Sequence, residues 1–201
     1  MNPKFVYPGG ATPLDPDELN GLIPDFVSLQ SELNALEQQN ILAAKNWLDL
    51  SLRKKELLSE AFTRELHSKM FSDVWRWAGK YRTSQKSIGS VLPSQISTDV
   101  HLLMKNVQVW ILHQSYSWPE ILARFHHRLV YIHPFANGNG RYSRLHTEAL
   151  ANRFHQSTPT WGAQQFSGVI DFNSEIRRKY IESLQQADNK KFSSLISFLY
   201  S

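Results

Sequence analysis

Apolar residues recur at helical spacing along most of the chain. Between residues 28 and 50, leucine, alanine and tryptophan return every three or four positions, which predicts one long amphipathic helix. Ser59 and Asp171 stand where helix caps are expected, and Pro119 falls in the first turn of a further helix. The other helices are predicted at residues 57–70, 96–113, 119–132, 139–154, 171–187 and 192–199. The pattern therefore predicts a mostly α-helical protein.

Two regions lack this spacing. Residues 1–27 are rich in proline and glycine, so we expect an extended arm with one short helical turn at Asp15–Leu19. Residues 79–94 are poor in helix formers, which predicts a small β-hairpin or flap. No internal repeat or linker is visible, so the chain divides into the arm, a leading helix (28–54) and one core domain (55–201).

Composition indicates the number of domains and the cellular compartment more than the function. A chain of 201 residues with 41% hydrophobic and 20% charged residues suits a single globular domain. Cysteine is absent, the N-terminus lacks the apolar core of a signal peptide, and no run suits a membrane span, so we expect a cytoplasmic protein. The net charge of +4 is compatible with a polyanionic ligand, but the scattered basic residues suit solubility better. Composition alone names no function.

The segment from His133 to Arg144 carries candidate chemistry. It reads His-Pro-Phe-Ala-Asn-Gly-Asn-Gly-Arg-Tyr-Ser-Arg and follows an amphipathic helix that Pro134 ends. Gly138 and Gly140 bracket the start of the next helix, which predicts a loop leading into a helix N-terminus. Unpaired backbone N–H groups and the helix dipole favour an anion at such a place.

Three side chains of this segment suit phosphate chemistry. Arg141 and Arg144 are three residues apart, so we expect them to share a helix face beside the anion. His133 immediately precedes the loop, where it can accept a proton from a hydroxyl that approaches a phosphate. Each feature alone is more often structural. Their combination in one short segment predicts a phosphoryl- or nucleotidyl-transfer site.

This segment resembles the motif of the Fic family, H-P-F-x-(D/E)-G-N-G-R-x-x-R, and matches every specified position except Asn137. The resemblance extends to the helix before the motif, the approach to the Fic flap and a late Fic helix, in residues 125–132, 77–82 and 178–187. It thus covers about residues 55–200. The resemblance implies a single-domain Fic-type helical bundle with one small β-hairpin flap.

The opening residues 12–24 resemble a bacterial Fic subgroup called mobile mystery protein B, which is associated with mobile elements. The family resemblance implies a protein adenylyltransferase that moves AMP from ATP to a Ser, Thr or Tyr hydroxyl of a target protein. The target would dock on the flap near residues 84–93 by strand addition. A role as a nucleic-acid-associated factor is the weakest alternative, since only the basic charge and the subgroup suggest it.

The resemblance also implies a role for each motif residue. His133 would be the general base, and Phe135 would anchor the loop in the core. The phosphates would lie against Gly138, Asn139, Gly140, Arg141 and Arg144. Asn139 would contribute its side chain, and Arg141 would bind the β-phosphate. Arg144 would bind the terminal phosphate or an inhibitory carboxylate.

Asn137 stands where the family usually has an Asp or Glu that coordinates Mg²⁺. An amide oxygen can bind Mg²⁺ but carries no charge, so Asn137 is a weak candidate ligand and metal affinity should fall. Three interpretations stay open: a slower AMP transferase, a Fic protein with another phosphate-containing substrate, and an inactive nucleotide-binding regulatory protein. Because the base, the loop and both arginines are retained, we expect catalysis to be retained.

Many Fic proteins are held inactive by a glutamate on a separate helix, in a pattern like (S/T)-x-x-x-E-(G/N), which pairs with the second motif arginine. The pattern is only partly matched here, because Leu33 replaces the hydroxyl residue and Gln38 replaces Gly or Asn. Glu37 is therefore either an inhibitory residue or a solvated helix residue. The sequence does not decide between the two.

Other candidates carry less weight. His126, His127 and His133 lack a recognised metal-binding spacing, and we expect one of the first two in the core and the other facing solvent. His146 and Trp161 suit structural roles, although Trp161 could instead border a nucleotide pocket. No P-loop or dinucleotide-binding glycine motif is present. The expected partners are ATP or another nucleotide and a target protein, with no membrane or nucleic acid; a homodimer is one option.

Overall fold

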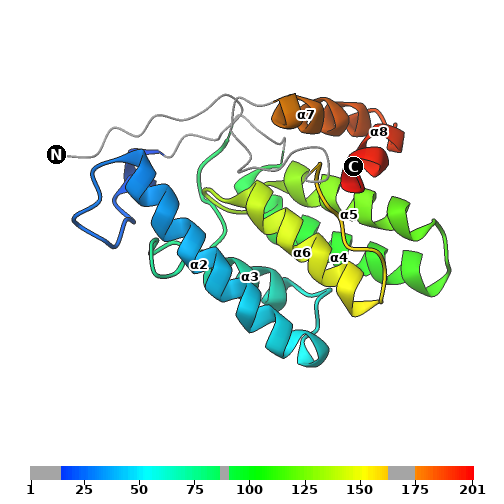
Figure 1. The fold of residues 1–201 in the computed structure, drawn as a ribbon, viewed down its shortest axis with the longest axis horizontal. Coiled ribbons are helices and arrows are strands. Elements are labelled where there is room, and N and C mark those ends of the chain that lie inside the picture. The colour runs from blue at the N-terminus through cyan, green and yellow to red at the C-terminus, as the bar shows by residue number, and fades with distance from the viewer. Residues whose placement is uncertain (1–14, 87–90, 163–174) are drawn as a thin grey trace.

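The computed structural model describes residues 15–86, 91–162 and 175–201 of the chain. These ranges are mostly helical, and apart from the helices they contain two isolated β-bridges, which bears out the predicted fold class (Figure 1). The helices are α1 (Pro16–Leu19), α2 (Gln30–Ser51), α3 (Glu60–Phe71), α4 (Ile96–Leu112), α5 (Trp118–Ile132), α6 (Asn139–Arg153), α7 (Glu175–Asp188) and α8 (Ser193–Leu199). Short 3₁₀ turns follow α2 (Leu52–Lys54) and precede α4 (Pro93–Gln95).

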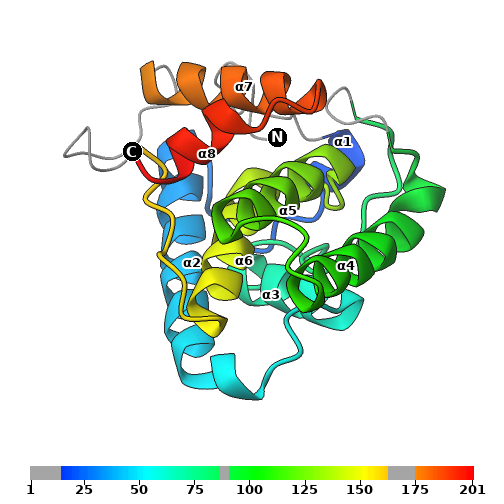
Figure 2. The same cartoon turned by 90° about the vertical axis from the view of Figure 1, so that its right-hand side faces the viewer.

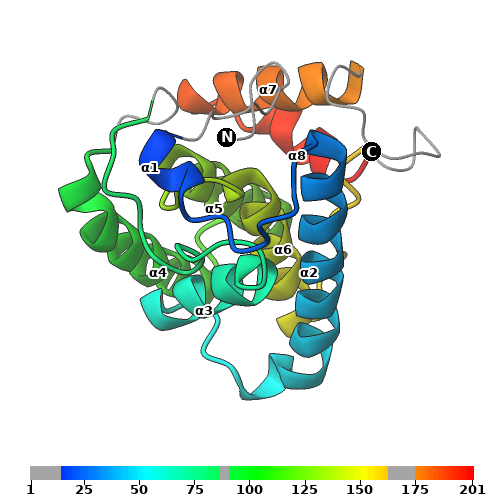
Figure 3. The same cartoon turned by 90° about the vertical axis from the view of Figure 1, so that its left-hand side faces the viewer.

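Helices α5 and α6 pack against each other at the centre of the bundle (Figure 2). α4 lies along α5, and α3 packs on both α4 and α6. α2 runs along the outer side of α3, and the pair α7 and α8 crosses one end of the bundle above α5 (Figure 3). The loop between α5 and α6 therefore lies at the middle of the molecule, where several elements can reach it.

Burial of the predicted apolar stripes accounts for this packing. Leu122, Phe125, Leu129 and Ile132 all face inward from α5 and are fully buried. Each such side chain stabilises the fold by about 1.5–3 kcal/mol relative to exposure. Ser59 caps α3 as predicted, since its hydroxyl accepts a hydrogen bond from the Phe62 N–H at 3.1 Å. Spacing and capping together thus account for where these helices begin and which face they bury.

The arm is fastened to the segment after α3. Leu22 and Trp75 form an antiparallel bridge, and the Ile23 N–H donates to the Val74 carbonyl at 2.9 Å. Gly21 fits here because a Cβ at this position would lie 2.5 Å from the Trp77 ring. The short helix predicted at Asp15–Leu19 is present as α1, beside this attachment.

Several predictions fall partly or wholly outside the described residues, among them the first half of the arm and the start of the helix predicted at 171–187. The cap proposed at Asp171 lies outside them, and so do residues 87–90 of the predicted hairpin. The described flanks of the hairpin form no strand, and Tyr81 bridges to Phe135 of the motif loop instead. Among the described helices, none has the length and apolar character that crossing a membrane requires.

Candidate active site

The loop between α5 and α6 is held in a conformation that depends on its sequence. His133 ends α5 with a left-handed backbone (φ 51°), and Gly138 precedes α6 with φ 75°. A Cβ on Gly138 would lie 2.5 Å from the Phe71 ring, so only glycine fits this turn. Beside Gly140, by contrast, no protein atom lies within 4 Å of the Cβ position. The loop therefore packs tightly on one side and leaves room for a ligand at the N-terminus of α6.

The Asn139 side chain closes the loop on itself. Its Oδ1 accepts from the Phe135 N–H at 2.9 Å, and its Nδ2 donates to the Phe135 carbonyl at 2.8 Å. Both polar ends of this amide therefore bind main chain, which differs from the expectation that the side chain faces a phosphate. Phe135 itself is fully buried, with its ring edge-on to Tyr142 at 5.1 Å.

His133 lies buried at the start of the loop, with 6% of its surface exposed. The pKa of its imidazole is lowered to about 4, mainly by burial and also by the nearby charges of Arg82 and Lys86, while a hydrogen bond with the Val130 main chain acts in the opposite direction. The ring is consequently neutral at pH 7. A neutral imidazole can accept a proton, which is the state that a general base requires.

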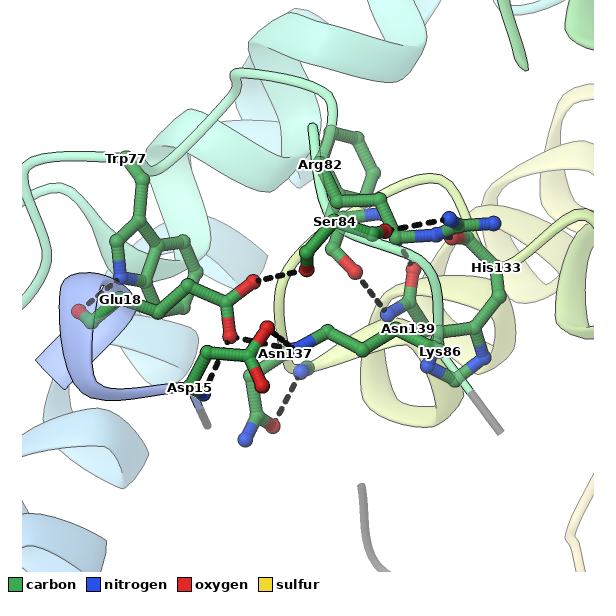
Figure 4. A network of polar contacts seen from close by, with 11 residues as sticks. Asp15, Glu18, Trp77, Arg82, Ser84, Lys86, His133, Asn137 and Asn139 are labelled. Carbon is green, nitrogen blue, oxygen red and sulfur yellow. Dashed lines mark hydrogen bonds and ion pairs between the residues drawn. The ribbon is translucent and has the colours of Figure 1, made fainter. Parts of the chain in front are cut away.

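Arg82 joins the flap segment to the motif loop (Figure 4). Its buried guanidinium donates to the main-chain carbonyls of His133 at 2.7 Å, Ser84 at 2.8 Å and Val91 at 2.7 Å. The Arg82 N–H also donates to the Pro134 carbonyl at 2.9 Å. These bonds fix the backbone that presents the His133 ring. No sequence pattern had indicated this role for Arg82.

A second connection reaches the site from the arm. The Lys86 ammonium lies 2.5 Å from a Glu18 carboxylate oxygen and 3.1 Å from an Asp15 oxygen, and its side chain is 3% exposed. The other Glu18 oxygen accepts from the Ser84 hydroxyl at 3.1 Å. Figure 4 shows this cluster beside the motif loop, between the Trp77 ring and the His133 ring. The arm thus helps to hold the flap segment against the site.

Replacing Glu18 with glutamine should lower the free energy of unfolding by about 1–3 kcal/mol, because the buried Lys86 ammonium would lose its main counter-charge. Asp15→Asn is the matched control. The Asp15 side chain is 49% exposed, so this variant should cost less than about 1 kcal/mol. Urea denaturation measures both values. Equal losses for the two variants would contradict the proposed importance of Glu18.

Glu37 approaches the motif from α2. It is buried, and its Oε2 lies 2.7 Å from Arg141 Nη1, while its Oε1 accepts from the Trp75 indole N–H at 2.7 Å. These contacts exclude the interpretation of Glu37 as a solvated helix residue. They also place the carboxylate on the first motif arginine, whereas the sequence pattern had indicated the second.

The two motif arginines face different neighbours. The Arg141 guanidinium lies over the Phe71 ring at 4.9 Å, and the Arg144 guanidinium lies over the Tyr180 ring of α7 at 5.8 Å. Although the two arginines lie three residues apart on α6, their guanidinium groups contact different helices. Arg144 also brings positive charge to Arg177, whose pKa is lowered by burial and then by that charge. The surroundings of α6 are thus strongly cationic near its N-terminus.

The remaining candidates have structural contacts. His126 is fully buried with its Nε2 2.9 Å from the Tyr180 hydroxyl, and half-buried His127 pairs with Asp188 at 2.8 Å near the surface. His146 is also buried, between the Tyr142 hydroxyl and the Leu57 carbonyl. Trp161 is a core residue whose indole N–H donates to Glu148 at 2.7 Å. The structural interpretation of His146 and Trp161 therefore agrees with these contacts.

The residues beside the loop fit a metal ion poorly. In the part of the chain that the structure describes, no three His, Cys, Asp or Glu side chains come together as a metal site. Asn137 offers one amide oxygen, and this atom accepts from the Gly138 N–H at 2.5 Å. A single uncharged oxygen already bound to main chain is a weak ligand for Mg²⁺.

A helical bundle in which this loop presents a buried histidine and two arginines has the architecture of a Fic domain. Residues 57–151 of the chain match the Fic/DOC family. The "Protein adenylyltransferase Fic" of Nematostella vectensis is 33% identical over 128 residues, which are 61% of this chain and 26% of that protein. The chain thus spans about a quarter of the length of this relative.

Solved structures show the same fold. A Fic domain containing signaling protein from Bacteroides thetaiotaomicron has a TM-score of 0.65 and 20% identity, with 81% of this chain and 66% of that chain covered. The N-terminal Fic domain of a Bartonella quintana protein, solved with bound ADP, has a TM-score of 0.64 and 16% identity. There, 87% of this chain and 86% of that chain are covered. Both structural similarities cover more of this chain than the family match at residues 57–151.

Proposed function

We propose that this protein is an adenylyltransferase that moves AMP from ATP to a Ser, Thr or Tyr hydroxyl of a target protein. The observation that carries the proposal is the neutral, buried His133 beside a helix N-terminus with two guanidinium groups. The name of the Nematostella vectensis relative supports the activity, and the ADP bound to the Bartonella quintana domain supports a nucleotide ligand.

Each step of this reaction can be assigned to residues of the chain. The backbone N–H groups at Gly138 and Gly140, together with Arg141 and Arg144, would hold the phosphates of ATP. The target hydroxyl oxygen then bonds to the α-phosphorus, the bond from that phosphorus to the β-phosphate oxygen breaks, and pyrophosphate leaves. The hydroxyl proton passes to the His133 imidazole. Asn139 contributes by closing the loop through Phe135.

The target protein would dock beside the flap segment. Arg82 holds the described part of this segment against the motif loop and Lys86 holds it to the arm, so a strand added at residues 84–93 would lie near His133. Extended backbone is recognised mainly through its own hydrogen bonds. The flap would therefore select the conformation of the target more than its sequence.

The transfer is tested with ATP labelled at either the α- or the γ-phosphate. In the Glu37→Gly variant, where the inhibitory contact is absent, α-label should appear on the protein itself and γ-label should not. Label from the γ-phosphate would show that the protein transfers a phosphoryl group and not AMP. If ATP bound without any transfer of label, the regulatory alternative would be correct. Asn137 is the observation that favours this alternative, because it weakens the metal site.

Changing Asn137 to aspartate should make nucleotide binding and self-modification more dependent on Mg²⁺. A carboxylate adds the negative charge that a hard divalent cation prefers, so we expect the Mg²⁺ concentration for half-maximal labelling to fall about tenfold. Titration of the labelling reaction with MgCl₂ measures this value for both proteins. Loss of nucleotide binding in Asn137→Asp would instead mean that the metal lies elsewhere.

A further inference from the structure

A fully buried histidine on α3 lies directly beneath the motif loop. The His67 ring stacks on the Phe135 ring with centroids 3.6 Å apart and planes 17° apart. The rings of Phe71 and Tyr142 surround it at 4.7 Å and 6.0 Å. Nothing in the reaction proposed above uses this side chain, although an imidazole is a costly group to bury in an apolar cluster.

Both nitrogens of the His67 ring are bound to main chain. Nδ1 accepts from the Gly79 N–H at 3.0 Å, and a backbone N–H can act only as a donor. The proton of the neutral ring is therefore on Nε2, which donates to the Asn137 carbonyl at 3.1 Å. The pKa of His67 is lowered to about 3, mainly by burial. The ring therefore stays neutral over the physiological range.

These two bonds connect the base of the flap segment with the motif loop. Gly79 begins the flap segment with φ 76°, and a Cβ there would lie 2.8 Å from the Arg64 carbonyl oxygen, so its backbone cannot shift easily. Asn137 is the fifth residue of the motif, immediately before Gly138. His67 is thus a rigid bridge from a fixed point on α3 and the flap base to the centre of the loop.

The Asn137 carbonyl and the Gly138 N–H belong to one peptide plane. In a trans peptide these two groups point in opposite directions, and the structure contains no cis peptide among the described residues. A hydrogen bond that fixes the carbonyl toward α3 therefore aims the Gly138 N–H away from α3. That N–H lies at the N-terminus of α6 and donates to the Asn137 Oδ1 at 2.5 Å, so an anion would bind there by replacing this amide oxygen as the acceptor.

We propose that His67 is a positioning residue, which orients the Asn137–Gly138 peptide for phosphate binding and supports the Phe135 ring beneath it. The inference rests on the proposed function only where the test measures self-labelling. It does not make His67 a proton donor in the reaction. A replacement that keeps the ring but removes both hydrogen bonds should therefore change nucleotide binding more than it changes stability.

Three variants separate this role from simple packing, each made in the Glu37→Gly background. His67→Phe keeps the aromatic ring and loses both hydrogen bonds, whereas His67→Gln keeps a donor and an acceptor and loses the ring. His146→Phe is the matched control, because His146 is equally buried but bonds to Tyr142 and the Leu57 carbonyl. Thermal unfolding shows whether each variant is folded.

The Kd for ATP and the KM and kcat of self-labelling are then measured. We expect His67→Phe to raise Kd and KM about tenfold with a smaller change in kcat, since ATP binds the loop before transfer. His67→Gln should recover part of this loss, and His146→Phe should leave Kd within about twofold. If the Glu37→Gly protein with His67 retained binds ATP without transferring label, the proposed function fails, while the Kd values still test His67.

Amide hydrogen exchange at Gly138 provides a test without nucleotide. In His67→Phe the Gly138 N–H should exchange at least about tenfold faster than in the His146→Phe control, because its peptide plane is no longer fixed. Unchanged ATP affinity and unchanged Gly138 exchange in a folded His67→Phe protein would overturn the proposal. If His67→Phe does not fold, the Kd of His67→Gln for ATP decides between the two roles. A near-normal Kd supports positioning by hydrogen bonds. A loss of ATP affinity equal to that of Phe135→Ala indicates packing alone and overturns the proposal.

Discussion

Replacing His133 with alanine should reduce AMP transfer by about 10²–10⁴-fold, the usual contribution of a general base. The imidazole is buried at the entrance to the loop, and because it is neutral it does not bind the phosphates through a positive charge. The affinity for ATP should therefore change by less than about threefold. Self-labelling from α-labelled ATP measures the first quantity, and equilibrium binding measures the second.

The pH dependence follows from the same burial. Because the pKa of His133 is lowered to about 4, the base is already deprotonated at pH 6, and transfer should be nearly constant between pH 6 and 8. Transfer should fall only as the pH approaches 4, where the imidazole becomes protonated. His101→Ala, which removes an exposed histidine of α4, should leave both the rate and the profile unchanged. Full activity in His133→Ala would mean that another group takes the proton.

The second large effect is expected at Glu37. Glu37→Gly should tighten ATP binding at least about tenfold and start self-modification, because the carboxylate and a phosphate compete for Arg141. Gln38→Gly is the matched control: it is exposed, adjacent on α2, and carries the same glycine cost of about 1 kcal/mol. Trp75→Phe should give an intermediate gain, since Glu37 then loses the indole N–H that orients it. ATP binding and labelling that match those of Gln38→Gly would refute the inhibitory role.

The sequence predicted most of the helices because their evidence is local. The α5 stripe and the Ser59 cap each depend on residues within a few turns, so spacing alone located them. The short helix at Asp15–Leu19 was also found locally, although its contacts with Ser84 and Lys86 were not. Those contacts join positions far apart in the chain, and no local pattern determines which segments meet.

The motif located the candidate site but not the direction of its side chains. Spacing on a helix suggested one face for Arg141 and Arg144, whereas their partners depend on α2 and α7, which flank α6 on different sides. In the same way, an asparagine can bind ligand or main chain, and the sequence could not show that Asn139 binds Phe135. The family pattern suggested an inhibitory carboxylate at Glu37, and only the structure gave its partner.

His67 and Arg82 were missed for a related reason. Each is a polar residue that follows one apolar or aromatic residue, Leu66 or Tyr81, and this was the available signal. A buried polar residue needs partners, so its presence next to a core stripe suggests a specific structural contact. The partners themselves are carbonyl groups of the motif loop, which residue types cannot reveal.

The bonds from Arg82 also have a consequence for how the protein folds. The His133 carbonyl and Arg82 are separated by 51 positions, so their contact requires a long stretch of chain to close first. Helices α3, α4 and α5 can each form from local contacts before this closure occurs. The motif loop then acquires its shape late, when the guanidinium is enclosed between the two segments. Partly folded chains would therefore show helical circular dichroism before the site has formed.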